Sequence, residues 1–185
     1  MYWYKTTKWT GFAMLCCIIL CGTACKPDIK ETGAALKYFD IKGYFSADIA
    51  HLNHLKIQVL KTVSHNGTTE SKTVKIDNWG QEFNLFIDAD INKPAWQKSY
   101  TVITDDSLLF YKAIDPELKM REMIIKRDNK QKVKWILIFN RTKNILYTTT
   151  EKLSYYPDSL YLIEKDQHVR LMGNNHYRIE GVIKH

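Results

Sequence analysis

A series of short β-rich segments fills the chain from residue 99 to its end, and this pattern restricts the possible folds more than any other feature. Aromatic and β-branched residues gather in these segments, and Asp, Asn, Pro and Gly stand between them. The predicted strands are residues 99–104, 108–114, 119–127, 132–140, 144–154, 160–165, 168–172 and 176–183. Connections this short join antiparallel neighbours and leave no room for parallel crossovers. The sequence therefore predicts an antiparallel meander and excludes a doubly wound α/β fold.

The predicted strand 132–140 is apolar on both of its faces. One face holds Val133, Trp135, Leu137 and Phe139, and the other holds Ile136 and Ile138. Successive side chains of a strand point to opposite sides of the sheet. We therefore expect this strand to be covered on both sides.

Two helices and a hairpin are predicted before the meander. Residues 34–55 carry apolar side chains at three- and four-residue steps, which is typical of an amphipathic helix. Asn66 and Gly67 stand between two β-rich runs, 57–63 and 69–76, and predict a tight hairpin. Asn78 resembles a helix cap, with Gln81 three positions later, and the short helix that it opens is expected to end near residue 91.

Together these elements predict an α+β fold. We expect a curved antiparallel β-meander that forms a partial barrel, with the two early helices packed on one face. The 185-residue chain suits a single folded domain. That domain would span residues 34–185, after a signal peptide at 1–24 and a polar tether at 25–33.

The first 25 residues have the order of a bacterial export signal. Lys5 and Lys8 precede an apolar run at residues 12–21, and three small residues at 22–24 then lead to Cys25. A run of this length is too short to span a bilayer, which needs about 20 apolar residues. We therefore expect cleavage before Cys25.

The segment Gly22-Thr23-Ala24-Cys25 resembles the lipobox of bacterial lipoproteins. Leucine is typical in place of Gly22, and the lipoboxes of Bacteroidota tolerate this departure. The resemblance implies that Cys25 is the lipidation site, carrying fatty acyl chains such as palmitate, and that the chain is anchored to a membrane. Lys26 stands where an aspartate favours retention in the inner membrane, so the outer membrane is the predicted location.

Cysteine positions and charge exclude several classes of function. All four cysteines lie at positions 16, 17, 21 and 25, so the body of the chain has no thiol for a disulfide, a zinc site or a nucleophile. The formal net charge is +7, and its bases are interleaved with acids rather than clustered in one stretch. We therefore expect no nucleic-acid partner.

A single histidine pair is the main candidate for catalysis or metal binding. His51 and His54 lie three positions apart, about one turn after Asp48, and could offer two imidazoles and a carboxylate to a metal ion. The alternative is the polar flank of an amphipathic helix. Nucleophile, phosphate-loop and dinucleotide motifs do not occur. We therefore assign no catalytic residue, no metal site and no cofactor.

Aromatic residues and two short triplets are the remaining candidates. Four aromatics are predicted contacts for an amphipathic or glycan ligand, with core packing as the alternative: Trp96, Tyr100, Tyr155 and Tyr156. Ser107 and Ser159 each follow an aspartate and precede a leucine. This triplet resembles the O-glycosylation signal of exported Bacteroidota proteins.

Three segments of the body resemble an uncharacterised family of small Bacteroidota membrane lipoproteins. They are residues 38–45 (YFDIKGYF), 91–96 (INKPAW) and 155–161 (YYPDSLY). The resemblance covers nearly all of the mature chain and implies location and source, without an activity.

The sequence therefore predicts a lipid-anchored lipoprotein of the bacterial cell envelope that binds a hydrophobic or glycan ligand or a partner protein. Helices on an incomplete barrel are similar in architecture to carriers of lipoproteins and hydrophobic ligands. The alternatives are a structural subunit of an outer-membrane complex and an envelope hydrolase.

Overall fold

The computed structural model describes residues 36–55 and 57–184, so the predicted signal peptide, tether and Cys25 lie outside the described residues. The helical elements are α2 (Ile41–Leu55), α3 (Trp79–Glu82), α4 (Asn84–Ile87) and the 3-10 turn η1 (Pro94–Trp96). The strands are β1 (Gln58–His65), β2 (Thr68–Lys75), β3 (Tyr100–Asp105), β4 (Leu108–Ala113), β5 (Met120–Arg127), β6 (Val133–Lys143), β7 (Tyr147–Tyr156), β8 (Leu160–Val169) and β9 (Gly173–Lys184).

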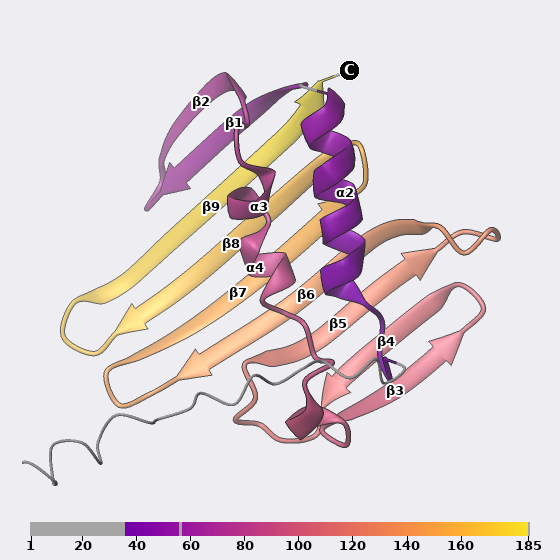
Figure 1. Ribbon diagram of the computed structural model, residues 1–185. Helices are drawn as coiled ribbons and strands as arrows, with labels where there is room; N and C mark the ends of the chain where they lie inside the picture. Colours follow the sequence, from indigo (N-terminus) through magenta and orange to yellow (C-terminus); the bar gives the residue numbers. More distant parts are fainter. Residues whose placement is uncertain (1–35, 56, 185) are drawn as a thin grey trace, which may run out of the picture. The chain divides into compact units, whose positions relative to one another are not determined.

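Within the described residues, nine strands form one antiparallel sheet in the order β2-β1-β9-β8-β7-β6-β5-β4-β3 (Figure 1). Strands β3 to β9 follow one another as the predicted meander, and the β1–β2 hairpin pairs with β9. The α+β class is therefore confirmed. The sheet is open, with β2 and β3 as its edges, so the predicted partial barrel is not confirmed.

The hairpin predicted at Asn66 and Gly67 is confirmed. Both residues have positive φ, 49° and 89°, as a tight two-residue turn between twisted strands requires. The Asn66 side chain also ties the turn to β9, because its Oδ1 accepts a hydrogen bond of 2.8 Å from the backbone N–H of His176. The hairpin is thus fixed beside the last strand of the meander.

The predicted turn at residues 166–167 is wrong, as is the separate strand at 168–172. Strand β8 runs on to Val169, and the chain reverses at residues 170–172 before Gly173, whose φ is +83°. Asp166 stays in the strand because it faces His176 of β9, and its Oδ1 lies within hydrogen-bond distance, 2.6 Å, of His176 Nδ1. Polar residues therefore extend this hairpin instead of ending it.

The first predicted helix is confirmed in position, although α2 begins only at Ile41. Asp40 precedes it, and its Oδ1 accepts a 2.8 Å hydrogen bond from the backbone N–H of Gly43, which caps the first turn. Residues 36–40 are not helical. The helix is therefore shorter than the predicted range.

The second predicted helix is split into α3 and α4, so two early helices are not confirmed. Asn78 does cap it, since its Oδ1 accepts a 3.0 Å hydrogen bond from the backbone N–H of Gln81. The break falls at Phe83, whose φ of −98° and ψ of 11° depart from helical values. Helical structure then ends at Ile87 rather than near residue 91.

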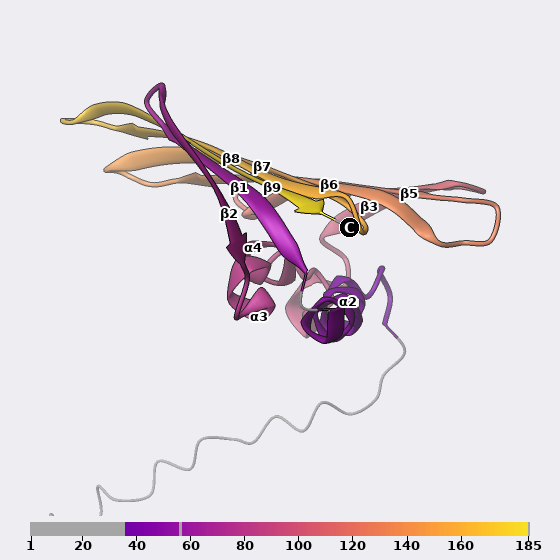
Figure 2. The ribbon, with the colours of Figure 1, turned by 90° about the horizontal axis from the view of Figure 1, so that it is seen from above.

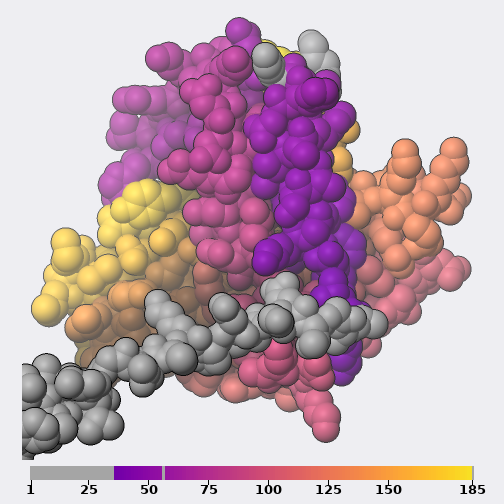
Figure 3. Space-filling model, viewed as in Figure 1, coloured from indigo at the N-terminus to yellow at the C-terminus, as the bar shows by residue number. Residues whose placement is uncertain are grey.

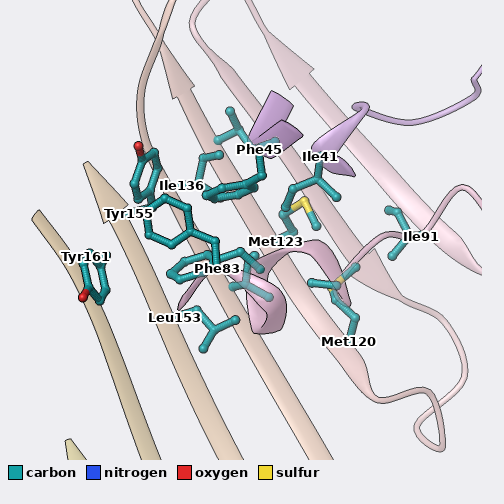
Figure 4. Close-up of a cluster of buried hydrophobic side chains, with 14 of the residues drawn as sticks. Ile41, Phe45, Phe83, Ile91, Met120, Met123, Ile136, Leu153, Tyr155 and Tyr161 are labelled. Atoms are coloured by element: carbon teal, nitrogen blue, oxygen red, sulfur yellow. The ribbon is translucent and has the colours of Figure 1, made fainter. Parts of the chain in front are cut away.

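All three helices lie on the same face of the sheet (Figure 2). On that face α2 and the α3–α4 segment run side by side (Figure 3). Their buried rings meet the sheet in one aromatic cluster (Figure 4). Phe45 of α2 lies 5.0 Å from Phe86 and 5.0 Å from Tyr155 of β7, measured between ring centroids. Tilted and edge-on rings at such distances add about 0.5–1.5 kcal/mol per pair to the effect of burial.

Candidate binding surface

The face of the sheet opposite the helices is not covered by any element of the described chain (Figure 2). Strand β6 shows how the two faces differ. Ile136 and Ile138 are fully buried under the helices, whereas Trp135, Leu137 and Phe139 point to the other side and are only partly buried. The prediction that this strand is covered on both sides is therefore wrong for the described residues. We call the opposite side the outer face.

Strand register aligns apolar side chains on the outer face. Directly paired residues of neighbouring strands share a face. One aligned set runs across β3 to β8: Ile103, Phe110, Ile124, Leu137, Ser154 and Leu162. A second set, one step along the strands, joins β7, β8, β9 and β1: Tyr156, Leu160, Val182 and Leu60. We call these two sets the apolar rows.

The apolar rows are partly open to solvent. Ile103 is 58% exposed and Tyr156 is 37% exposed, while Ser154, flanked by Leu137 and Leu162, is buried. Neighbouring side chains therefore shield one another without being covered from above. A contiguous apolar surface of this kind is a feature of interaction sites.

Charged residues border the apolar rows across β7, β8 and β9. Arg178 donates to Glu164 at 2.7 Å and to Glu180 at 2.8 Å, and Lys152 lies 3.6 Å from Glu164. The hydrogen bond to Glu180, with further support from Glu164, raises the pKa of the Arg178 guanidinium. The positive charge of Arg178 is thus held in place beside the apolar surface.

Two open hollows lie further along the same strands. One has a volume of about 420 Å³ and is lined in part by Phe139, Lys152 and Glu164. The other, of about 380 Å³, is lined in part by Thr150. Both hollows include the hydrogen-bonded side chains of Asp166 and His176. The outer face therefore combines an apolar part with a polar, charged part.

The helix-covered face holds a separate polar contact between α2 and the sheet. The hydroxyl of Tyr155 donates a hydrogen bond to Oδ2 of Asp48. Burial raises the pKa of Asp48, and the hydrogen bond from Tyr155 opposes that shift. Burial and the nearby Asp48 charge raise the pKa of Tyr155. This pair joins α2 to β7 and serves a structural role.

The predicted histidine pair does not form a metal site with its neighbours. His51 Nε2 lies 3.7 Å from Asp158 Oδ1, and His54 is exposed. Across residues 36–55 and 57–184, no three His, Cys, Asp or Glu side chains are grouped so as to hold a metal ion.

The four predicted ligand-contact aromatics do not share one surface. Tyr155 is fully buried, and Tyr100 is 4% exposed with its hydroxyl 3.3 Å from the Met120 carbonyl oxygen. Trp96 is half-buried in η1. Tyr156 alone of the four lies on the outer face, in the apolar rows.

The two predicted glycosylation serines differ in their surroundings. Ser159 is exposed in the β7–β8 turn. Ser107 is half-buried, and its hydroxyl accepts a 2.7 Å hydrogen bond from Lys126 Nζ. Only the Ser159 hydroxyl is therefore readily reached from solvent, and glycosylation of either serine stays a prediction.

The apolar rows are not evident as a site in the sequence. The one signal of them is the double-sided apolar pattern of residues 132–140, which predicts burial on both faces of the strand. Cross-strand register, which aligns Leu137 with Ile124 and Leu162 through Ser154, becomes visible only in the folded sheet.

No protein-family model, curated protein or solved structure matches this chain. Among the described residues, none of the helices has the length and hydropathy that a membrane crossing requires.

Proposed function

We propose that this protein is a lipid-anchored lipoprotein of the bacterial cell envelope that binds a partner protein through the outer face of its sheet. The observation that carries the proposal is the pair of apolar rows, which lie opposite the helices and are bordered by charged residues. An apolar centre with a polar rim is the usual arrangement of a protein–protein interface.

The shape of the surface favours a protein over a small hydrophobic ligand. Small-ligand sites are concave and bury most of the ligand. The apolar rows spread across the sheet from β3 to β1, and the hollows at its polar end are lined by charged residues such as Lys152 and Asp166. A glycan could contact that polar end, but the apolar rows offer it little. A partner protein would use both parts.

The anchor at Cys25 rests on the sequence, because this residue lies outside the described residues. Two or more acyl chains would hold the protein firmly on a membrane, which we propose to be the outer membrane. Metabolic labelling with a palmitate analogue should label the wild-type protein and not the Cys25→Ala variant. Cys21→Ala is the matched control and should stay labelled; equal labelling of the Cys25→Ala variant would contradict the anchor.

Partner binding is tested by co-purification from gently solubilised envelopes. We expect the Leu137→Ser/Leu162→Ser variant to lose proteins that co-purify with the wild type. Leu55→Ser is the control, because Leu55 is an apolar residue, 46% exposed, on α2. If the outer-face variant retains the same proteins at the same yield, the outer face is not the binding surface.

A permanent partner would make the protein a structural subunit of an outer-membrane complex, which is the second candidate. The same outer face would carry that interaction. A binding protein and a structural subunit differ in the lifetime of their complex with the partner. Pulse-chase labelling, which measures how fast the partner is exchanged, therefore separates the two. The envelope hydrolase has no support in the geometry around His51 and His54.

A further inference from the structure

The most exposed large apolar side chains of the described chain all lie in three turns. Their exposed fractions exceed those of every other large apolar residue that is described. They are Leu171 (96%), Ile145 (83%), Met172 (81%), Leu146 (68%) and Ile114 (63%). Full exposure of aliphatic side chains on neighbouring turns calls for a physical reason.

These three turns lie at the same end of the sheet. They connect β4 to β5, β6 to β7 and β8 to β9, and in a meander every second connection falls at one end (Figure 1). The backbone N–H of Arg170 donates a 3.0 Å hydrogen bond to the carbonyl oxygen of Leu146, which joins the last two turns. We call the turns at residues 143–147 and 169–173 the apolar tips.

The turns themselves do not require these apolar residues. At residues 143–147, Asn144 Oδ1 accepts hydrogen bonds from the backbone N–H groups of Leu146 and Tyr147, at 2.9 and 2.8 Å. At residues 169–173, Gly173 supplies the positive φ. None of these contacts involves the side chain of Ile145 or Leu171.

The turns at the opposite end of the sheet are polar. They join β3 to β4, β5 to β6 and β7 to β8, and their charged residues are Asp106, Asp128, Lys130, Lys132 and Asp158. The two ends of one meander thus differ in hydropathy, so exposed aliphatic side chains are not a general property of its turns.

Basic groups flank the apolar tips. Lys143 and Arg170 are exposed and border Ile145 and Leu171, one in each turn. Between the turns lies an open hollow of about 590 Å³, whose lining includes the cations Lys143 and Arg170 and one acid, Glu117. This arrangement offers positive charge at the base of protruding aliphatic side chains.

We propose that this end of the sheet docks on an anionic lipid surface, with the apolar tips inserted at the level of the headgroups. Aliphatic side chains gain free energy on leaving water for the headgroup–acyl boundary, and adjacent cations attract anionic headgroups. Lys143 and Arg170 would contact lipid phosphates while Ile145, Leu171 and Met172 enter the interface. The outer face of the sheet would then stand upright on the membrane and remain open to a partner.

The proposed anchor would support this contact, and this one step rests on the lipidation of Cys25. The chain from Cys25 to the first described residue, Leu36, spans 36 − 25 = 11 residues. A segment of that length extends at most about 40 Å. The folded domain would therefore stay near the membrane, where docking needs no diffusional search. Docking through the apolar tips does not itself require the lipid anchor.

Hydrogen exchange of the full chain on vesicles tests the docking. The protein is reconstituted into vesicles rich in phosphatidylglycerol, into phosphatidylcholine vesicles, or kept in detergent. We expect backbone amide exchange at the apolar tips to slow about tenfold on phosphatidylglycerol and much less on phosphatidylcholine. The polar turns at residues 106–107 and 128–132, at the opposite end of the sheet, should exchange alike in all three samples.

Variants assign the effect to the tips. Ile145→Ser/Leu146→Ser/Leu171→Ser/Met172→Ser should abolish the slowing, whereas Val102→Ser/Ile103→Ser, which removes exposed apolar residues from β3, should leave it intact. Lys143→Gln/Arg170→Gln should lower the affinity of the tips for phosphatidylglycerol vesicles about 30-fold, because each lost cation lowers that affinity about fivefold.

Four outcomes would overturn the proposal. Amide exchange at the tips could be the same with and without anionic vesicles, or exchange at the polar turns of the opposite end could slow equally. Slowing produced by inorganic phosphate alone would indicate a site for free anions. If amide exchange at the tips is slow in detergent and slows further as the protein concentration is raised, the tips contact a second copy of this chain. Each result is distinguishable from loss of partner binding at Leu137 and Leu162, which does not involve the tips.

Discussion

The ring of Tyr161 lies across Gly181, its direct partner on the neighbouring strand β9, so that a methyl group at Gly181 would come within 2.2 Å of the ring. Tyr161 is fully buried, and its hydroxyl donates a 2.6 Å hydrogen bond to Oε1 of Glu82 on α3. The absence of a side chain at Gly181 therefore leaves the space that allows β8 to hold α3 against the sheet.

We expect Gly181→Ala to destabilise the fold by about 1–3 kcal/mol, because the ring must shift and weaken its hydrogen bond to Glu82. Urea unfolding followed by circular dichroism measures the loss. The control is the same substitution in a Tyr161→Leu background, where the smaller side chain should reduce its cost. An equal cost in both backgrounds would show that the ring is not the reason for glycine.

The hydroxyl of Tyr161 makes its own contribution through Glu82, which also binds Lys61 at 2.7 Å. Tyr161→Phe removes one hydrogen bond to a carboxylate and should cost about 1.5–3 kcal/mol in unfolding free energy. Tyr147→Phe is a control on a partly buried tyrosine of β7. A loss no greater than that of the control would contradict a structural role for the Tyr161–Glu82 contact.

Much of the fold could be predicted from the sequence, because its signals are local. The turn residues Asn66 and Gly67 predicted the first hairpin, and the short connections between strands predicted the meander. The break at Phe83 and the extension of β8 past Asp166 depend on tertiary packing and on cross-strand pairing with His176. Those distant partners are absent from a local pattern, so the helix split and the strand ends could not be predicted.

The partly buried carboxyl of Asp48 makes the stability of the fold depend on pH. Burial raises its pKa in the folded state, so the folded protein holds this proton more tightly than the unfolded chain does. At acid pH the carboxyl is protonated and its burial does not reduce the free energy of unfolding. That free energy falls as pH rises through the raised pKa of the folded state, and the full loss is reached above it. Asp48→Asn keeps an oxygen that can accept from Tyr155 but cannot ionise.

The stability of Asp48→Asn relative to wild type should therefore improve as pH rises from about 4 to about 7. Urea unfolding at several pH values measures this difference. A difference for Asp48→Asn that shrinks with rising pH would contradict the raised pKa.

Two adjacent residues of β6 test the assignment of the sheet faces. Ile138 is fully buried beneath the helices, so Ile138→Ala should cost about 2–5 kcal/mol. Leu137 is only partly buried on the outer face, so Leu137→Ala should cost about 1 kcal/mol. Thermal unfolding of both variants gives the comparison, and equal losses would mean that the outer face is part of the folded core.

The candidate site was only partly accessible to sequence reasoning. The apolar residues Trp135, Leu137 and Phe139 were recognised, but a pattern on one strand cannot say whether another layer covers it. Coverage depends on the face of the sheet against which the helices pack. The contact between Phe45 and Tyr155, which lie 110 residues apart in the chain (155 − 45), helps to place α2 on the inner face. Similarly, Tyr100 and Tyr155 could be core or surface until their strands were placed.

Site-specific photocrosslinking in intact cells tests whether the outer face of the sheet binds a partner protein. A photoreactive amino acid is placed at Leu137 on the outer face or, as the control, at Asn53 on the exposed side of α2. We predict a discrete crosslinked protein adduct from position 137 that is absent or much weaker from position 53. Adducts of equal yield at both positions, or none at 137 and one at 53, would contradict partner binding through the outer face.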